Sequence, residues 1–247
     1  MASKKKDVLC LSIAGILIAG AFFYLGTFWY SLPRKASFES RVNAPLANTL
    51  AMMQQRIASH TTYFGVRAQK CPMDHWVYQE IVFETQPDVI IEIGTNCGGG
   101  LLGLAHFCDL MNHGRVIGID ITLEHVAQAV RDHPRATLIE SDACEAFPEV
   151  ASLVQPGERV MVIEDSAHTY DNTLAVLRTY SPLVTPGCYF VVEDSICQHG
   201  VPVGPEPGPY EAIETFMKET GRFAIDRSRE SFGITWNPKG YLRCNSE

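Results

Sequence analysis

Hydrophobic residues near the N-terminus form one continuous stretch. Residues 8–32 contain no charged side chain, and lysines and arginines flank the stretch on both sides. A helix needs about 20 apolar residues to cross a bilayer, whereas the apolar region of a cleaved signal peptide is roughly 7–15 residues long. Aromatic residues gather toward the end of the stretch, as they do at membrane interfaces. Residues 1–35 are therefore predicted to be a single-pass membrane anchor, with the N-terminus in the cytoplasm because Lys4, Lys5 and Lys6 are contiguous.

Beyond this stretch the apolar pattern changes. Residues 36–60 read as a linker and a helical lead-in, because apolar residues recur at helical spacing between positions 42 and 60. From residue 61 to 247 we expect one domain, in which short apolar runs alternate with helical stretches such as 169–184. The predicted strands are residues 88–93, 115–119, 136–139, 159–163 and 188–192.

Alternation of strand and helix predicts a parallel sheet with helices on both faces. The runs are almost continuously apolar, as is typical of strands that are buried on both faces. Residues 232–236 and 240–243 are predicted to form a closing antiparallel hairpin around Asn237-Pro238-Lys239. The expected fold class is α/β: a doubly wound, mostly parallel, seven-stranded Rossmann-like sheet that ends in an antiparallel hairpin.

An acidic residue stands at or just after the end of every predicted parallel strand. These residues are Glu92, Asp120, Asp142, Asp165 and the pair Glu193-Asp194. Any one of them could cap a helix or face water, but ligands of open α/β sheets bind outside the carboxyl ends of the strands. The recurrence at all five strands predicts a single ligand-binding crevice.

A glycine-rich loop, residues 92–100, follows the first predicted strand. A dinucleotide site requires Gly-x-Gly-x-x-Gly, and Asn96 occupies the position of the second glycine, so the loop suits a ligand without a pyrophosphate. Asp120 could accept hydrogen bonds from two ribose hydroxyls, and Asp142 could lie beside an adenine. This layout resembles the class I methyltransferases, which implies that S-adenosylmethionine binds to Glu92, Gly94, Thr95, Gly98, Asp120 and Asp142.

Overall charge narrows the range of partners. The net charge of −8 argues against nucleic-acid binding, which requires a basic face. None of the eight cysteines is in a Cys-x-x-Cys pair, so most are interpreted as small buried thiols.

Further motifs make the resemblance more specific. They are Phe64-Gly65, Lys70-Cys71-Pro72-Met73-Asp74, Tyr78-Gln79-Glu80, Glu164-Asp165-Ser166-Ala167-His168-Thr169, Val191-Val192-Glu193-Asp194, Phe223-Ala224-Ile225-Asp226-Arg227 and Asn237-Pro238-Lys239-Gly240-Tyr241-Leu242. Together they resemble the cephalosporin hydroxylase family, which includes rhamnosyl O-methyltransferases, over about residues 60–243. The resemblance implies a divalent metal on Asp165, Glu193 and Asp194, with His168 as the general base, and a sugar hydroxyl as the acceptor.

The chemistry of these residues is consistent with that implication. Converging carboxylates raise each other's pKa unless a cation lies between them, and a set of oxygen ligands favours Mg²⁺. A bound metal acidifies a hydroxyl, and His168, three residues after Asp165, could accept the proton; it could also simply cap a helix. Residues 195–210, rich in proline and glycine, could be a lid or an ordered surface loop.

Other functions stay open at this stage. An NAD-dependent oxidoreductase is disfavoured by the glycine spacing, and an iron-dependent hydroxylase by the lack of any His-x-Asp or His-x-Glu. A catalytically inactive, membrane-tethered binding module on the same fold is the remaining alternative. The chain could also form a homo-oligomer.

Overall fold

The structure, a computed structural model, describes residues 42–245. The predicted anchor at residues 8–32 lies outside these residues and stays a prediction. Within the described part, no helix is both long enough and apolar enough to cross a membrane. The chain groups into one compact unit from Met53 onward and another before it. The domain bounds proposed from the sequence stay predictions.

A seven-stranded sheet organises the unit that starts at Met53. Its strands are β3 (Val89–Ile93), β4 (Arg115–Asp120), β5 (Ala136–Glu140), β6 (Val160–Glu164), β7 (Tyr189–Val192), β8 (Phe223–Ile225) and β9 (Tyr241–Cys244). Their order is β5-β4-β3-β6-β7-β9-β8, with β9 antiparallel to both β7 and β8 and the other neighbours parallel. The predicted α/β fold with a mostly parallel sheet is confirmed.

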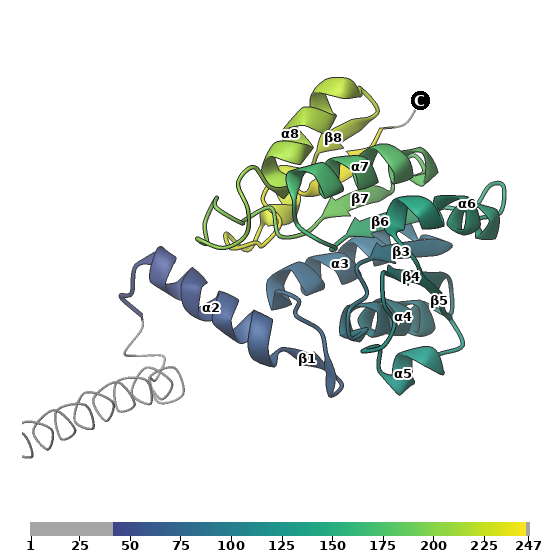
Figure 1. Cartoon of the computed structure of the whole chain (residues 1–247), viewed down its shortest axis with the longest axis horizontal. Coiled ribbons are helices and arrows are strands. Elements are labelled where there is room, and N and C mark those ends of the chain that lie inside the picture. Colours follow the sequence, from purple (N-terminus) through teal and green to yellow (C-terminus); the bar gives the residue numbers. More distant parts are fainter. Residues whose placement is uncertain (1–41, 246–247) are drawn as a thin grey trace, which may run out of the picture. The chain divides into compact units, whose positions relative to one another are not determined.

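Helices cover both faces of this sheet (Figure 1). In chain order they are α3 (Pro72–Thr85), α4 (Gly99–Met111), α5 (Gln128–Arg131), α6 (Ala143–Leu153), α7 (Tyr170–Tyr180) and α8 (Pro209–Glu219), with short 3-10 turns η1 (Ser181–Leu183) and η2 (Arg227–Glu230). Another helix, α2 (Leu46–His60), precedes them in the chain. A small antiparallel pair, β1 (Thr62–Tyr63) and β2 (Val66–Arg67), follows α2.

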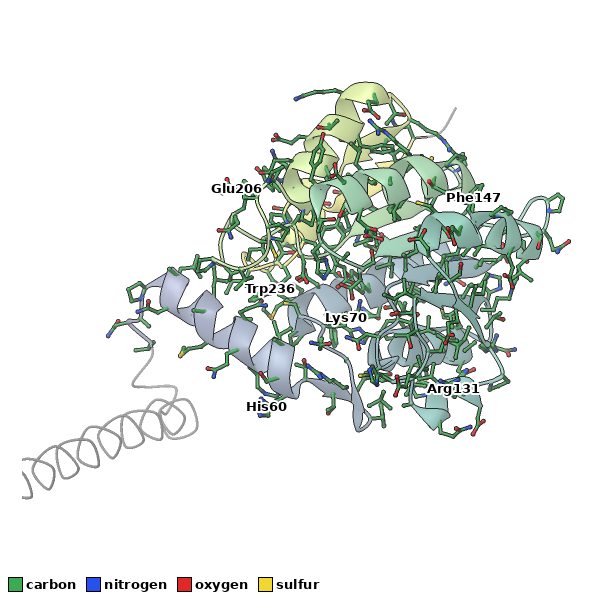
Figure 2. All side chains as sticks on the ribbon, in the orientation of Figure 1. His60, Lys70, Arg131, Phe147, Glu206 and Trp236 are labelled. Carbon is green, nitrogen blue, oxygen red and sulfur yellow. The ribbon has the colours of Figure 1, made fainter. Side chains whose placement is uncertain are left out.

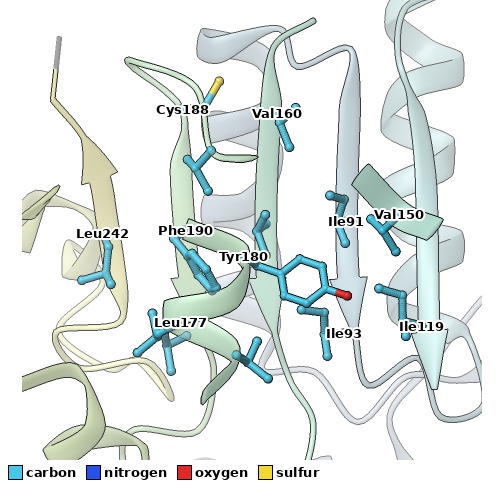
Figure 3. Close-up of a cluster of buried hydrophobic side chains, with 14 of the residues drawn as sticks. Ile91, Ile93, Ile119, Val150, Val160, Leu177, Tyr180, Cys188, Phe190 and Leu242 are labelled. Carbon is cyan, nitrogen blue, oxygen red and sulfur yellow. The ribbon is translucent and has the colours of Figure 1, made fainter. Parts of the chain in front are cut away.

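Two apolar cores result from the alternation of side chains along the strands. Ile91 and Ile93 point to the core beneath α6, α7 and α8, while Ile90 points to the core beneath α3 and α4. Figure 3 shows Leu177 and Tyr180 of α7 lying over the first of these faces. Strands β3, β6 and β7 are buried throughout, which agrees with their nearly continuous apolar sequence, whereas β5 at the edge of the sheet is only partly buried.

The sheet reverses its winding between β3 and β6. From β3 the chain proceeds outward to β4 and β5, whereas from β6 it proceeds to β7 on the other side. Loops therefore separate at the carboxyl ends of β3 and β6 and leave a crevice there, which is where open α/β sheets bind ligands. The acidic strand ends surround this point.

The predicted closing hairpin is wrong in its first strand. Residues 232–236 form no strand, and the antiparallel partner of β9 is β8, at Phe223–Ile225. Gly233 has a φ of +70°, outside the extended region, and the Trp236 backbone N–H donates to the Asp74 carboxylate at 2.7 Å. Thr235 and the Trp236 N–H therefore bond Asp74 of α3 rather than a strand neighbour.

Candidate active site

A cavity of about 470 Å³ opens at the carboxyl ends of β3, β4, β5 and β6. Eight of the residues predicted for the site line it: Glu92, Gly94, Thr95, Asp120, Asp142, Asp165, His168 and Asp194. Gly98 and Glu193 are not part of the lining. Gly98 instead precedes α4. Its φ of +88° and the Val130 side chain that a Cβ would meet explain why a glycine is needed at this position.

The glycine loop brings three segments into close contact. A Cβ on Gly94, whose φ is +91°, would collide with the backbone carbonyl of Asp165. A Cβ on Gly100 would lie 2.5 Å from Cε of Lys70 and 2.7 Å from Oε1 of Glu92. These glycines therefore let the ends of β3 and β6 and the Lys70 side chain approach one another, which any other residue would prevent.

Asp120 and Asp142 are held by backbone amides, those of Asp142 from its own loop and those of Asp120 from its own loop and from the glycine loop. Asp120 accepts hydrogen bonds from the N–H groups of Asn96 at 2.7 Å and Thr122 at 3.2 Å. Asp142 is the N-cap of α6, and its Oδ1 accepts from Cys144 and Glu145. Asp142 therefore both caps a helix and lines the cavity, two roles that the sequence offered as alternatives.

Lys70, which is labelled in Figure 2, lies between three of the acidic residues. Its ammonium contacts the Asp165 carboxylate, lies 2.5 Å from Oε1 of Glu193 and 3.1 Å from Oε1 of Glu92, and is only 8% exposed. Burial acts to lower the pKa of Lys70, but the surrounding carboxylates outweigh burial and raise that pKa well above its usual value. Lys70 is thus a permanent cation within this site.

One ammonium does not satisfy all of these carboxylates. Neither oxygen of Glu92 accepts a hydrogen bond from the described residues, although its side chain is buried. Burial raises the pKa of Glu92 against the opposing charge of Lys70, and burial together with Asp165 raises the pKa of Glu193 well above normal. The site therefore has the electrostatic character of a place that binds further positive charge.

His168 lies beside the same acids on the solvent side. Its Nε2 is 3.2 Å from Oδ2 of Asp194 and 3.7 Å from Oδ1 of Asp165. Both His168 and Asp194 have a left-handed backbone, with φ of +51° and +55°, a strained conformation that is frequent at functional sites. Burial raises the pKa of Asp194 to about 6, and His168 acts in the opposite direction.

Donor atoms from these residues fall into two groups that share Asp165. Ligand atoms of Asp165, His168 and Asp194 lie within 4.8 Å of one another, and so do those of Glu92, Asp165 and Glu193. Asp165 is therefore the point at which the predicted metal ligands meet. The predicted set of Asp165, Glu193 and Asp194 spans both groups.

Sequence reasoning gave no role to Lys70 or to the amides that support the site. Lys70 was visible only as part of a motif with Cys71 and Pro72, because its partners lie far along the chain. Asn172 of α7 and Ser166 also line the cavity, and both donate to the buried Glu164 carboxylate. By contrast, no residue of 195–210, which the sequence offered as a lid or a surface loop, is part of the lining.

Comparison with known proteins identifies the family. The family model described as rhamnosyl O-methyltransferase/CmcI matches residues 55–245. A rhamnosyl O-methyltransferase of Mycobacterium tuberculosis (strain ATCC 25618 / H37Rv) is 36% identical over 195 residues, which are 75% of this chain and 78% of the relative. The corresponding protein of Mycobacterium leprae (strain TN) is 36% identical over 196 residues, which are 74% and 82% of the two chains.

A solved relative has the same fold. An apo structure of CmcI superposes with a TM-score of 0.61 at 25% identity and covers 76% of this chain and 78% of that one. The family resemblance found in the sequence is confirmed. It replaces the alternatives of an NAD-dependent oxidoreductase and of an inactive binding module. The chain belongs to the rhamnosyl O-methyltransferase/CmcI family and is an S-adenosylmethionine-dependent O-methyltransferase.

Proposed function

We propose that this enzyme methylates a hydroxyl of a sugar-containing acceptor, with a divalent cation held by Asp165, Glu193 and Asp194 and with His168 as the general base. The observation that carries the proposal is the convergence of the Glu92, Asp165 and Glu193 carboxylates on Lys70 at the winding reversal of the sheet, with Asp194 and His168 beside Asp165. The mycobacterial relatives named rhamnosyl O-methyltransferase support the acceptor class.

The residues present fit a hard divalent cation. Their donors are carboxylate oxygens, which Mg²⁺ prefers. The single Lys70 ammonium is shared by three carboxylates, and neither oxygen of the buried Glu92 accepts a hydrogen bond from the described residues. S-adenosylmethionine supplies a sulfonium methyl, and a divalent cation lowers the pKa of a hydroxyl that it binds. Glu92, Gly94, Thr95, Asp120 and Asp142 are proposed to hold the former, and Asp165, Glu193 and Asp194 the latter.

His168 has an arrangement that suits proton removal. With Nε2–H directed at Asp194, the lone pair of a neutral imidazole is on Nδ1, which makes no hydrogen bond with the described part of the chain. Asp194 would fix this tautomer and stabilise the imidazolium that forms when Nδ1 takes the hydroxyl proton. As the new O–C bond forms, the C–S bond breaks and the electron pair stays on sulfur.

Transfer to defined acceptors tests the proposed function. The purified enzyme would be incubated with S-adenosylmethionine and either a rhamnose-terminated glycan or the same glycan lacking one hydroxyl. We expect a product heavier by one CH₂ only when the hydroxyl is present, and none after treatment with a chelator. Full transfer with metal confirmed absent would rule out the role of the cation. Transfer only to non-sugar alcohols would rule out the proposed acceptor class.

A membrane attachment completes the proposal. The uncharged run at residues 8–32 is long enough to cross a bilayer, so the full-length protein should stay in the membrane fraction through an alkaline carbonate wash. A variant that lacks residues 1–35 should move to the supernatant. Recovery of the uncleaved full-length protein in the supernatant would contradict the anchor.

A further inference from the structure

The loop that carries Asp194 is hydrogen-bonded to a second loop, residues 235–240. Asn237 Oδ1 accepts a hydrogen bond from the Asp194 N–H at 3.1 Å, Ile196 N–H donates to the Trp236 carbonyl at 3.0 Å, and Ser195 Oγ donates to the Pro238 carbonyl at 2.7 Å. Only the first of these bonds uses a side-chain acceptor. It is also the bond that reaches the residue with the left-handed backbone.

Asn237 is itself fixed from its other end. It is fully buried, and its Nδ2 donates to the hydroxyl of the buried Tyr78 at 2.8 Å. The backbone before it is held by Asp74, whose carboxylate accepts from Thr235 Oγ1 at 2.5 Å and from Trp236 N–H. An amide that is bonded at both ends cannot rotate, so its oxygen is held against Asp194.

We propose that Asn237 is a positioning residue: its amide holds the Asp194 backbone in the left-handed conformation that aims the carboxylate at His168 and Asp165. The left-handed region is unfavourable for a residue with a side chain, so Asp194 would relax unless its N–H were held. Partners behind a metal ligand typically change metal affinity by about 10–100-fold when they are removed. This inference rests on the proposed function only for the metal.

Asn237→Ala tests the assignment with two measurements. Titration calorimetry with Mn²⁺ should show affinity weakened by about 10–100-fold, while S-adenosylmethionine affinity stays within about twofold, since the cofactor is held at other strand ends. Amide hydrogen exchange at Asp194 should become about tenfold faster, whereas Val192, whose N–H donates to the Gly240 carbonyl, should keep its protection. Unchanged exchange at Asp194 in a folded Asn237→Ala protein would overturn the proposal.

A matched control and a milder variant keep the test decisive. Ser195→Ala removes a buried hydrogen bond between the same two loops but none at Asp194, so metal affinity and Asp194 exchange should match the wild type. If Asn237→Ala does not fold, Tyr78→Phe frees one end of the amide and should accelerate Asp194 exchange by a smaller factor. Wild-type exchange in that variant would also overturn the proposal. If the wild type binds no Mn²⁺, the metal assignment fails, and the exchange data still decide the role of Asn237.

Discussion

The two ends of the cavity hold their acids in opposite ways. At the ends of β4 and β5, Asp120 and Asp142 each accept two backbone N–H bonds, from their own loops and, for Asp120, also from the glycine loop. At the ends of β3, β6 and β7, the carboxylates are packed against one another and around one lysine. The first pair is satisfied by neutral backbone amides, whereas the second group depends on a charged side chain from a distant part of the chain.

This difference predicts which substitutions should change ligand affinity and which should change folding stability. Acids that are stabilised by neighbouring amides can be replaced without leaving a buried charge unpaired. The acids around Lys70 depend on that cation instead, because removing Lys70 leaves buried negative charges uncompensated. Ligand affinity and folding stability should therefore separate along the edge of a single sheet.

The largest effect is expected at the acid-rich end, from His168→Ala. Loss of a general base should lower kcat by about 10²–10⁴-fold, while metal and S-adenosylmethionine binding are retained. Steady-state kinetics together with calorimetry measure the two parts. His113→Ala is a matched control, since His113 also pairs with an aspartate, Asp88 at 3.3 Å, but lies at the amino ends of the strands. An active His168→Ala enzyme would take His168 out of the mechanism.

Lys70→Met should produce the next largest effect, this time on folding. With its ammonium gone, the buried charges of Glu92 and Glu193 have no counter-ion, and breaking such a group typically costs about 3–5 kcal/mol. Because the pKa values of both carboxyls are already raised, the loss measured by urea unfolding should shrink as the pH falls and they become protonated.

A surface lysine or arginine should behave differently. Arg178→Met removes an exposed ion pair with Glu219 and should change the free energy of unfolding little. Equal stability of Lys70→Met and Arg178→Met at neutral pH would show that the carboxylates at this end are not held by Lys70. The contrast between the two ends of the cavity would then lose its physical basis.

At the other end of the cavity, Asp120→Ala should weaken cofactor binding and leave the folding stability nearly unchanged. If Asp120 accepts from two ribose hydroxyls, each charge-assisted bond is worth about 1.5–3 kcal/mol, so the Kd for S-adenosylmethionine should rise at least tenfold in calorimetry. Asp120→Asn retains an acceptor for the Asn96 and Thr122 amides and should lose less. Unchanged affinity in Asp120→Ala would remove this residue from the cofactor site.

The same contrast explains what could be predicted from the sequence. The strands and their acidic ends follow from local signals: a run of apolar residues, then a carboxylate at the position where the strand stops. The predicted run 88–93 is one residue longer than β3 at its start, and the predicted run 159–163 is shifted by one residue from β6. The winding of the sheet then brings their ends together without further information.

Residues positioned by long-range packing gave no such signal. Lys70 precedes α3 in an irregular segment and reaches partners that follow β6 and β7, and Asn237 reaches Asp194 across more than 40 positions of the chain. The hairpin error has the same origin, because residues 232–236 have alternating character but are held by Asp74 and Gln54 rather than by a strand. Burial within the tertiary structure, not local pattern, determines these contacts.

The smallest effect is expected at Glu164, at the end of β6. Its Oε1 accepts from Ser166 at 2.6 Å and Asn172 at 3.1 Å, its Oε2 is buried without a partner, and burial raises its pKa to about 8. The folded protein therefore binds this proton more tightly than the unfolded chain, and stability from this group falls as the pH rises from the unfolded pKa of about 4.3 through about 8.

Glu164→Gln imitates the protonated form, so its free energy of unfolding should gain about 1 kcal/mol relative to the wild type between pH 6 and pH 7. Glu158→Gln is the control, because a hydrogen bond from Arg115 lowers the pKa of Glu158 and its proton is lost well below pH 6. A difference between Glu164→Gln and the wild type that does not change with pH would mean that Glu164 is already ionised in the folded protein.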